Sequence, residues 1–66
     1  MNPFVFAKIY QVLTTDDSLY SGVVNQVTGN EVTLRLTTDS EYFFTDDVVT
    51  LPLSQIIAYI EVPWNE

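Results

Sequence analysis

Residues 19–36 read LYSGVVNQVTGNEVTLRL, and this stretch decides the fold of the 66-residue chain. Two apolar runs flank TGNE at 28–31, a short Gly-containing loop that is typical of a β-hairpin. On the second arm Val32, Leu34 and Leu36 alternate with polar residues. Successive side chains of a strand point to opposite faces, so this alternation predicts a half-buried strand. The sequence therefore predicts a hairpin at the centre of a sheet.

Further strand-forming segments flank this hairpin on both sides. Residues 4–13, FVFAKIYQVL, are rich in β-branched and aromatic residues and favour a strand, with an N-terminal amphipathic helix as the alternative. Gly22 weakens a strand unless the backbone bends or approaches a neighbour closely there, so we expect a bend that curls the sheet. Two more strands are predicted at 48–51, limited by Pro52, and at 56–62, with one helical or 3₁₀ turn at 53–55 between them. The predicted fold is all-β: a single domain, residues 1–66, built as a small, strongly bent five-stranded barrel of the SH3-like kind.

The composition limits both the stabilising devices and the partners of the chain. It contains no cysteine and no histidine, so a disulfide or a zinc or haem site is not expected. Apolar residues make up 47% of the sequence, more than one small barrel hides, which indicates an oligomer. Nine acidic residues face only Lys8 and Arg35, for a net charge of −7. Nucleic-acid binding normally leaves a basic patch, so we expect no DNA sequence recognition.

Catalysis and metal binding find little support in the residue inventory. General acid–base work at neutral pH usually employs histidine, or a carboxyl or lysine tuned by burial, and the carboxylates here cluster in turns. We therefore expect a non-enzymatic chain without cofactors. The acidic cluster at 39–47 offers oxygen atoms that a hard cation prefers, but its spacing matches no EF-hand loop, which favours a solvated loop. The aromatic residues at 42–44 within that loop are candidates for core filling, for a subunit or partner contact, or for base stacking. Trp64 in the tail is a candidate lid on the core or a contact to a neighbour.

Two features of the sequence bear on the expected cellular location of the protein. Met1-Asn2-Pro3 lacks the positive region of a signal peptide. No apolar run approaches the roughly 20 residues that a membrane span needs. We expect a soluble, cytoplasmic protein with no membrane contact.

The order of these pieces resembles the Sm-like (LSm/Hfq) family. Residues 12–36 look like its first motif, with DSLYSG at 17–22 where the family often has Asp-Gly-x-x-x-Gly. VVTLPLSQIIAYI at 48–60 looks like its second motif, a short strand, a one-turn connection and a last strand. The resemblance covers roughly residues 8–62 and implies a strongly bent five-stranded barrel that assembles into a homo-oligomeric ring. In such a ring the fourth strand of one subunit pairs with the fifth of the next, which implies interface residues Val48, Val49, Leu51, Ile57, Tyr59 and Glu61.

The resemblance also implies RNA binding by two loops that face the pore of the ring. In this sequence they correspond to Thr28, Gly29 and Asn30 in the hairpin and to Leu53 and Ser54 before the last strand. The family usually places an Asp and an Asn in the first loop and Arg-Gly or Lys-His in the second. Only Asn30 matches, and neither loop holds a cation.

Two other functions remain open from the residues themselves. One is an acidic protein-interaction module, of the kind that a phage or mobile element encodes, that uses its charge against a basic protein. The other is an SH3-like barrel that serves as a subunit of a larger complex without binding nucleic acid.

Overall fold

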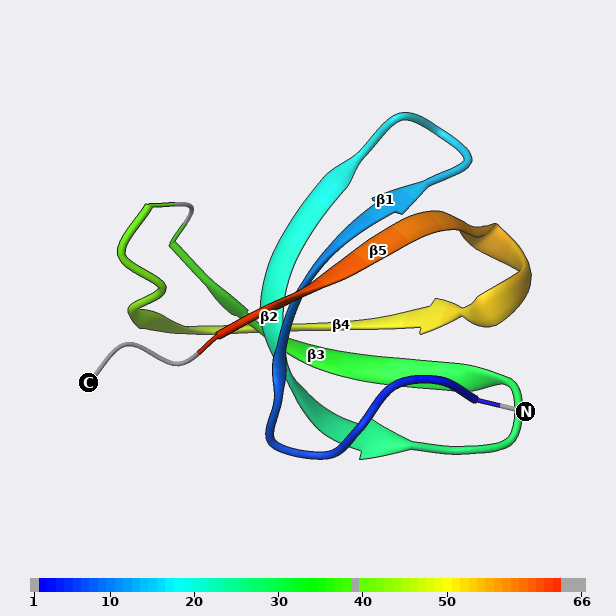
Figure 1. The fold of residues 1–66 in the computed structure, drawn as a ribbon, viewed down its shortest axis with the longest axis horizontal. Coiled ribbons are helices and arrows are strands. Elements are labelled where there is room, and N and C mark those ends of the chain that lie inside the picture. The colour runs from blue at the N-terminus through cyan, green and yellow to red at the C-terminus, as the bar shows by residue number, and fades with distance from the viewer. Residues whose placement is uncertain (1, 39, 64–66) are drawn as a thin grey trace.

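A computed structural model describes residues 2–38 and 40–63 of the chain. Five antiparallel strands form one sheet in the order β4-β3-β2-β1-β5 (Figure 1). The prediction of an all-β fold built on a central hairpin is confirmed, because β2 and β3 are that hairpin. The elements are β1 (Ile9–Thr14), β2 (Leu19–Val27), β3 (Glu31–Thr37), β4 (Phe44–Pro52), the 3₁₀ turn η1 (Leu53–Gln55) and β5 (Ile56–Val62).

Two predicted boundaries were wrong. The first strand begins at Ile9 rather than at residue 4, because the preceding segment makes a turn in which the Lys8 N–H donates to the Val5 carbonyl at 3.2 Å. The alternative of an N-terminal helix is also wrong. The fourth strand begins at Phe44 rather than at residue 48, because Phe44 already pairs with Thr37 on β3. The acidic residues that follow Phe44, predicted to be a loop, therefore belong to a strand.

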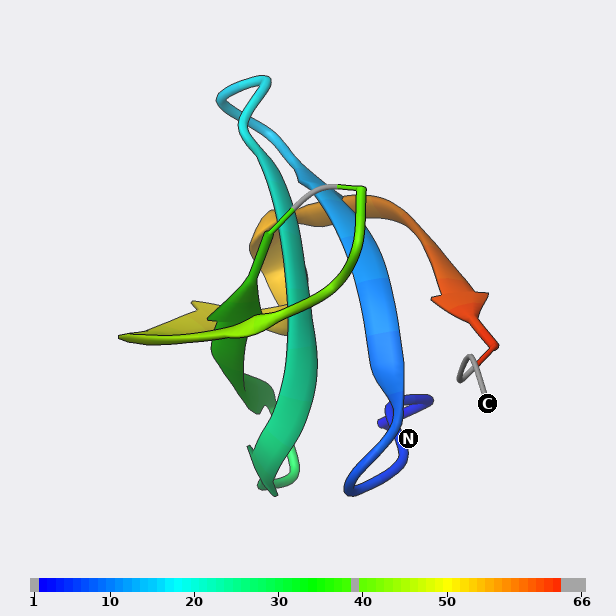
Figure 2. The same ribbon diagram turned by 90° about the vertical axis from the view of Figure 1, so that its left-hand side faces the viewer.

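The sheet is curled but not closed, so the predicted barrel is an open one. β4 pairs only with β3, and β5 only with β1, among the described residues, although η1 joins these two edge strands directly. The pairing register shifts in β1–β5, β2–β3 and β3–β4, and such bulges bend strands and increase their twist. Figure 1 shows the strong curvature of β2, and Figure 2 shows β4 crossing β2 at a steep angle as the sheet curls.

Gly22 allows the closest approach in this curled sheet. A Cβ atom at this position would lie 2.8 Å from the carbonyl oxygen of Arg35 and 3.0 Å from the Cβ of Leu34, both on β3. Non-bonded heavy atoms essentially never come closer than 3.0 Å to a Cβ atom. Glycine is therefore required here by the close approach of β3, whereas the irregularity of the β2–β3 pairing lies at Val24/Gln26 rather than at Gly22.

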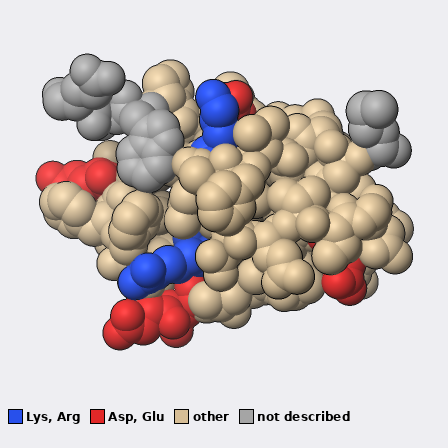
Figure 3. Space-filling model, turned by 90° about the horizontal axis from the view of Figure 1, so that it is seen from below, with Lys and Arg blue, Asp and Glu red and all other residues tan. Residues whose placement is uncertain are grey.

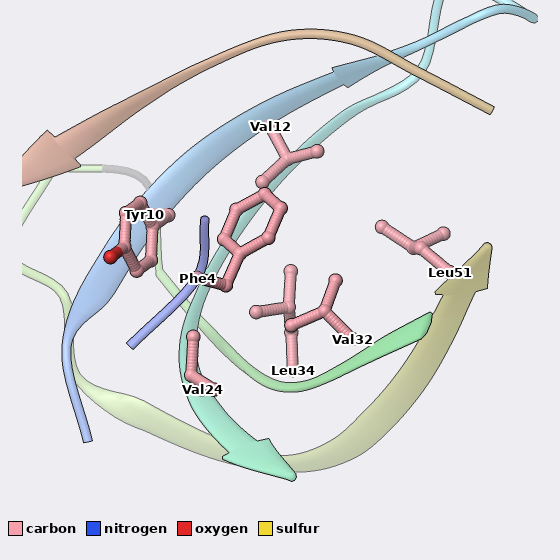
Figure 4. Packing of buried hydrophobic residues seen from close by; sticks show 7 residues of the cluster. All are labelled: Phe4, Tyr10, Val12, Val24, Val32, Leu34 and Leu51. Carbon is pink, nitrogen blue, oxygen red and sulfur yellow. The ribbon is translucent and has the colours of Figure 1, made fainter. Parts of the chain in front are cut away.

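The core lies on the concave face of the sheet (Figure 4). Val12, Val24, Val32 and Leu34 are at most 1% exposed and come from β1, β2 and β3. The alternation predicted for the second hairpin arm is thus confirmed. The full buried cluster comprises Phe4, Tyr10, Val12, Val24, Val32, Leu34 and Leu51.

The N-terminal segment crosses one end of the curled sheet and supplies a core residue. The ring of Phe4 is 5% exposed, and its centroid lies 4.9 Å from those of both Tyr10 and Tyr59. The side-chain amide of Asn2 donates to the carbonyls of Thr28 and Glu31, at 2.8 and 3.0 Å. These contacts attach the segment to the hairpin loop and make it part of the fold.

Candidate functional site

The two loops that the resemblance assigned to RNA lie together at one end of the molecule. The backbone N–H of Leu53 donates to the carbonyl of Asn30 at 2.9 Å, which joins η1 to the hairpin loop. Thr28, Gly29, Asn30 and Ser54 are exposed, and Leu53 is half-buried. Within the loop, the Glu31 N–H donates to the Thr28 hydroxyl at 3.2 Å, so the exposed groups are held in a defined turn.

Both basic side chains, Lys8 and Arg35, form ion pairs with carboxylates outside these loops. The Lys8 Nζ atom lies 3.3 Å from a carboxylate oxygen of Glu61, and the Arg35 Nη2 atom lies 3.8 Å from the Asp46 Oδ1 atom. Arg35 Nε also donates to the carbonyl of Thr45 at 2.8 Å. Figure 3 shows the basic groups beside acidic ones rather than gathered in a patch. Phosphate binding depends on such a patch, so the loops lack the electrostatic part of an RNA site.

The second candidate site consists of the two unpaired sheet edges. In the strand order β4 ends the sheet on one side and β5 on the other, among the described residues. Each edge strand bears exposed apolar side chains: Val48 is 56% exposed on β4, and Ile57 is 58% exposed on β5. An unpaired edge with apolar side chains is a template for adding another strand.

A hollow of about 250 Å³ lies on the core side of β5, next to its free edge. It is lined by residues of the N-terminal segment, of η1 and of β5. Ile57 contributes an exposed wall, whereas the Tyr59 ring is already in contact with Phe4. The lining residues are Pro3, Phe4, Leu53, Ile56, Ile57 and Tyr59. A strand added to this edge would place an apolar side chain beside the hollow.

The six residues expected at a subunit interface have different surroundings in the single chain. Val48, Ile57 and Tyr59 are exposed, and Val49 is half-buried. Leu51 is 5% exposed within the core of the chain, so its backbone rather than its side chain is at the edge. Glu61 forms the ion pair with Lys8.

The aromatic residues at 42–44 do not form one cluster. Tyr42 has a φ of 58°, and its hydroxyl accepts a hydrogen bond from the Gln11 amide at 3.1 Å, which ties the loop to β1. Phe43 is 62% exposed. Phe44 lies under the Arg35 guanidinium, 5.4 Å from the ring centroid, in a cation–π contact. The expectation of core filling is therefore wrong for Phe43 and Phe44, which are exposed, and Tyr42 is half-buried.

The acidic residues form no metal site among residues 2–38 and 40–63. Asp46 and Asp47 lie on β4, whereas Asp39 and Trp64 fall outside the described part of the chain. Asp16 has a structural role in the β1–β2 turn, where its carboxylate accepts hydrogen bonds from the Thr14 hydroxyl and from the Ser18 N–H. The Thr14 hydroxyl is the main cause that lowers the pKa of Asp16, with the Ser18 N–H adding to it.

Sequence reasoning missed the Asn2 and Phe4 contacts and a second hollow on the outer face over Ala58. The signal for the outer-face hollow was present, because Ala58 is the one small residue in the apolar run IIAYI. The hydrogen bonds of the Asn2 side chain could not be predicted from the sequence, because their acceptors are backbone carbonyls.

Comparison with known proteins gives no relative from which a role could be transferred. No protein family, no curated protein and no solved structure matches the chain. The described residues include no helix with the length and apolar character to cross a membrane.

Proposed function

We propose that this chain is a non-catalytic, Sm-like assembly module whose copies join head to tail through their free sheet edges and close into a ring. The observation that carries the proposal is that β4 and β5 each have an unpaired edge among the described residues and that each bears an exposed apolar side chain, Val48 and Ile57. Because the two edges are different surfaces, contact between them is heterologous, and such contacts give rings when the rotation closes.

The side chains of the two edges support this pairing. In β4, Val48 is exposed, and the adjacent Val49, whose side chain points to the opposite face, is half-buried. A β4 strand placed along β5 would therefore present an apolar side chain to each face of the extended sheet. On the core side it would meet Ile57 and the hollow of about 250 Å³. Pairing would remove both free edges and cover exposed apolar area at the same time.

RNA contact is not included in this proposal. The two loops implied by the resemblance are adjacent, but Lys8 and Arg35 are both engaged in ion pairs elsewhere. The strand order β4-β3-β2-β1-β5, with the edge strands joined by a single 3₁₀ turn, supports the assembly part of the resemblance rather than its recognition part.

The test is the solution mass of the chain and of Ile57→Lys by light scattering coupled to size exclusion. We expect the unchanged chain at a multiple of 7.5 kDa, and Ile57→Lys at a lower mass, because a lysine would be buried unpaired in the interface. Phe6→Lys is the matched control, since it adds the same charge at a residue 67% exposed in the N-terminal turn.

Ile57 is a better position for this test than Tyr59, because the Tyr59 ring supports Phe4 and Tyr10 and its loss would weaken the fold itself. Circular dichroism of each variant establishes that the strands are retained. A single-chain mass for the unchanged protein over a wide concentration range would refute the proposal. Equal masses for Ile57→Lys and Phe6→Lys would refute the placement of the interface on β5.

A further inference from the structure

The convex, outer face of the sheet carries a second apolar hollow, separate from the core. It has a volume of about 190 Å³ and spans β2, β1 and β5. Across these strands Leu13 pairs with Leu19 on one side and with Ala58 on the other. In the next row, Gln11 pairs with Ile60. The hollow lies over Ala58, because this is the smallest side chain of the lining.

The side chains around this hollow are unusually exposed for their type. Leu19 is 64% exposed and Ile60 is 63% exposed, and they border the hollow from β2 and from β5. Single exposed apolar residues are ordinary, but apolar residues gathered around a concavity are typical of a contact surface. The size of the hollow suits one apolar side chain of a partner.

The charges near the hollow are acidic. The turn that joins β1 to β2 carries Asp16 and Asp17, directly between the strands that supply Leu13 and Leu19. Both residues are exposed. The hydrogen bonds from Thr14 and then Ser18 lower the pKa of Asp16 and so favour its ionised form. Both basic side chains of the chain are already paired with carboxylates, so none is left to neutralise this turn.

We propose that the outer-face hollow is a docking site for a protein partner that inserts one apolar side chain over Ala58 and places flanking lysine or arginine residues against Asp16 and Asp17. Charge complementarity selects this occupant, because complementary charges steer encounter and suppress like-charged partners. A second copy of the chain fits less well, since its basic side chains, Lys8 and Arg35, are already paired with its own carboxylates and cannot flank the hollow. The site uses side chains of the outer face and not the free backbone of β5, so it does not depend on the proposed ring.

The test measures fluorescence anisotropy with labelled short peptides of alternating lysine and leucine. Peptides of alternating lysine and serine, and of alternating glutamate and leucine, are the ligand controls. We expect the lysine–leucine peptide to bind most tightly, with an affinity that falls as salt is added. Ala58→Leu fills the hollow and is expected to weaken this binding by about tenfold, the loss equivalent to leaving one apolar side chain exposed. Val5→Leu, which enlarges an apolar residue that is 50% exposed outside the hollow, should leave the affinity unchanged.

A second pair of variants tests the charge. Asp16→Asn with Asp17→Asn keeps the oxygen that accepts the turn hydrogen bonds, and asparagine tolerates the φ of 66° at position 17. This double variant should weaken binding of the lysine–leucine peptide and flatten its salt dependence. Asp46→Asn with Asp47→Asn makes the same charge change on β4 and should have a smaller effect.

Three results would overturn the proposal. The first is equal affinity of Ala58→Leu and Val5→Leu for the lysine–leucine peptide. The second is equal binding of the lysine–serine peptide, since this would leave the hollow without a role. The third is a fall in the solution mass of Ala58→Leu without a change in peptide affinity, since this would assign the hollow to a second copy. A failure of the ring test at Ile57 leaves both peptide-affinity comparisons unaffected.

Discussion

Replacing Gly22 with alanine tests the close packing of β2 against β3. The added Cβ would lie 2.8 Å from the Arg35 carbonyl oxygen, which is a backbone atom of the adjacent strand. It would also lie 3.0 Å from the Cβ of Leu34, a residue that is 0% exposed. Neither neighbour is the end of a flexible side chain, so relief requires that the strands move apart.

The expected cost follows from this geometry. Overpacking of a tight interior site costs about 1–3 kcal/mol. A 66-residue domain has roughly 3–10 kcal/mol of stability in total, at about 0.05–0.15 kcal/mol per residue, so the loss is a large fraction. Each kcal/mol should lower the melting temperature by about 4–8 °C.

Gly29→Ala provides the control on the same hairpin. A Cβ at Gly29 would have no atom within 4 Å, and no glycine of the described chain has a positive φ. This substitution should therefore leave stability unchanged or raise it by about 0.4–1 kcal/mol, because it restricts the unfolded chain.

The assay is urea unfolding followed by far-ultraviolet circular dichroism at several protein concentrations. The concentration series is needed because self-association raises the apparent stability by mass action. We expect the midpoint of Gly22→Ala to fall and that of Gly29→Ala to hold or rise. A Gly22→Ala midpoint equal to that of the unchanged protein would refute the argument that glycine is required for the strands to approach.

Two further predictions concern the N-terminal segment and the β1–β2 turn. Phe4→Ala should cost about 3–5 kcal/mol, measured as a lower urea midpoint, because the ring is 5% exposed between two tyrosines; Phe4→Leu should restore most of the loss, and a midpoint unaffected by Phe4→Ala would contradict the burial. The lowered pKa of Asp16 means that its ionised form favours the folded state above the unfolded pKa of about 4, and that this contribution disappears as the pH falls through the lower folded value. Asp16→Asn should therefore reduce the loss of melting temperature between about pH 5 and pH 2 more than Asp47→Asn does, and equal pH profiles for the two variants would contradict the role of the turn hydrogen bonds.

The strands could be predicted where their pattern was local. The hairpin follows from the alternation that begins at Val32 and from the short Gly-containing loop before it, which is typical of a hairpin. The start of β4 could not be predicted, because acidic residues favour a loop by propensity, whereas here they are exposed on an edge strand. The prediction of a strand at residues 4–8 was wrong because propensity there favours a strand. These residues instead make a turn, and Phe4 before it packs into the core.

Some features of the candidate sites could likewise be predicted from the sequence, whereas others depend on which strands become neighbours. Pro52 indicated the end or an edge position of the fourth strand, because proline cannot donate to a sheet ladder. The edge position of the last strand was implied by the resemblance alone, since a strand that is apolar on both faces is typical of a covered strand. The ion pairs of Lys8 and Arg35 could not be predicted, because they depend on which strands become neighbours. The outer-face hollow likewise requires Leu19, Leu13 and Ala58 to meet across three strands, which only the register determines.

The pairing of β1 with β5 has a consequence for the order of folding. The first four strands follow one another in a meander, so each pairing between them closes a short loop. The pairing of β1 with β5 joins residues far apart in the sequence, such as Ile9 and Val62. Loop-closure entropy grows with the length of the loop, so we expect this pairing to form last and to slow folding. During synthesis the outer edge of β1 therefore stays unpaired longest, and the nascent chain is most exposed to misassembly along that strand.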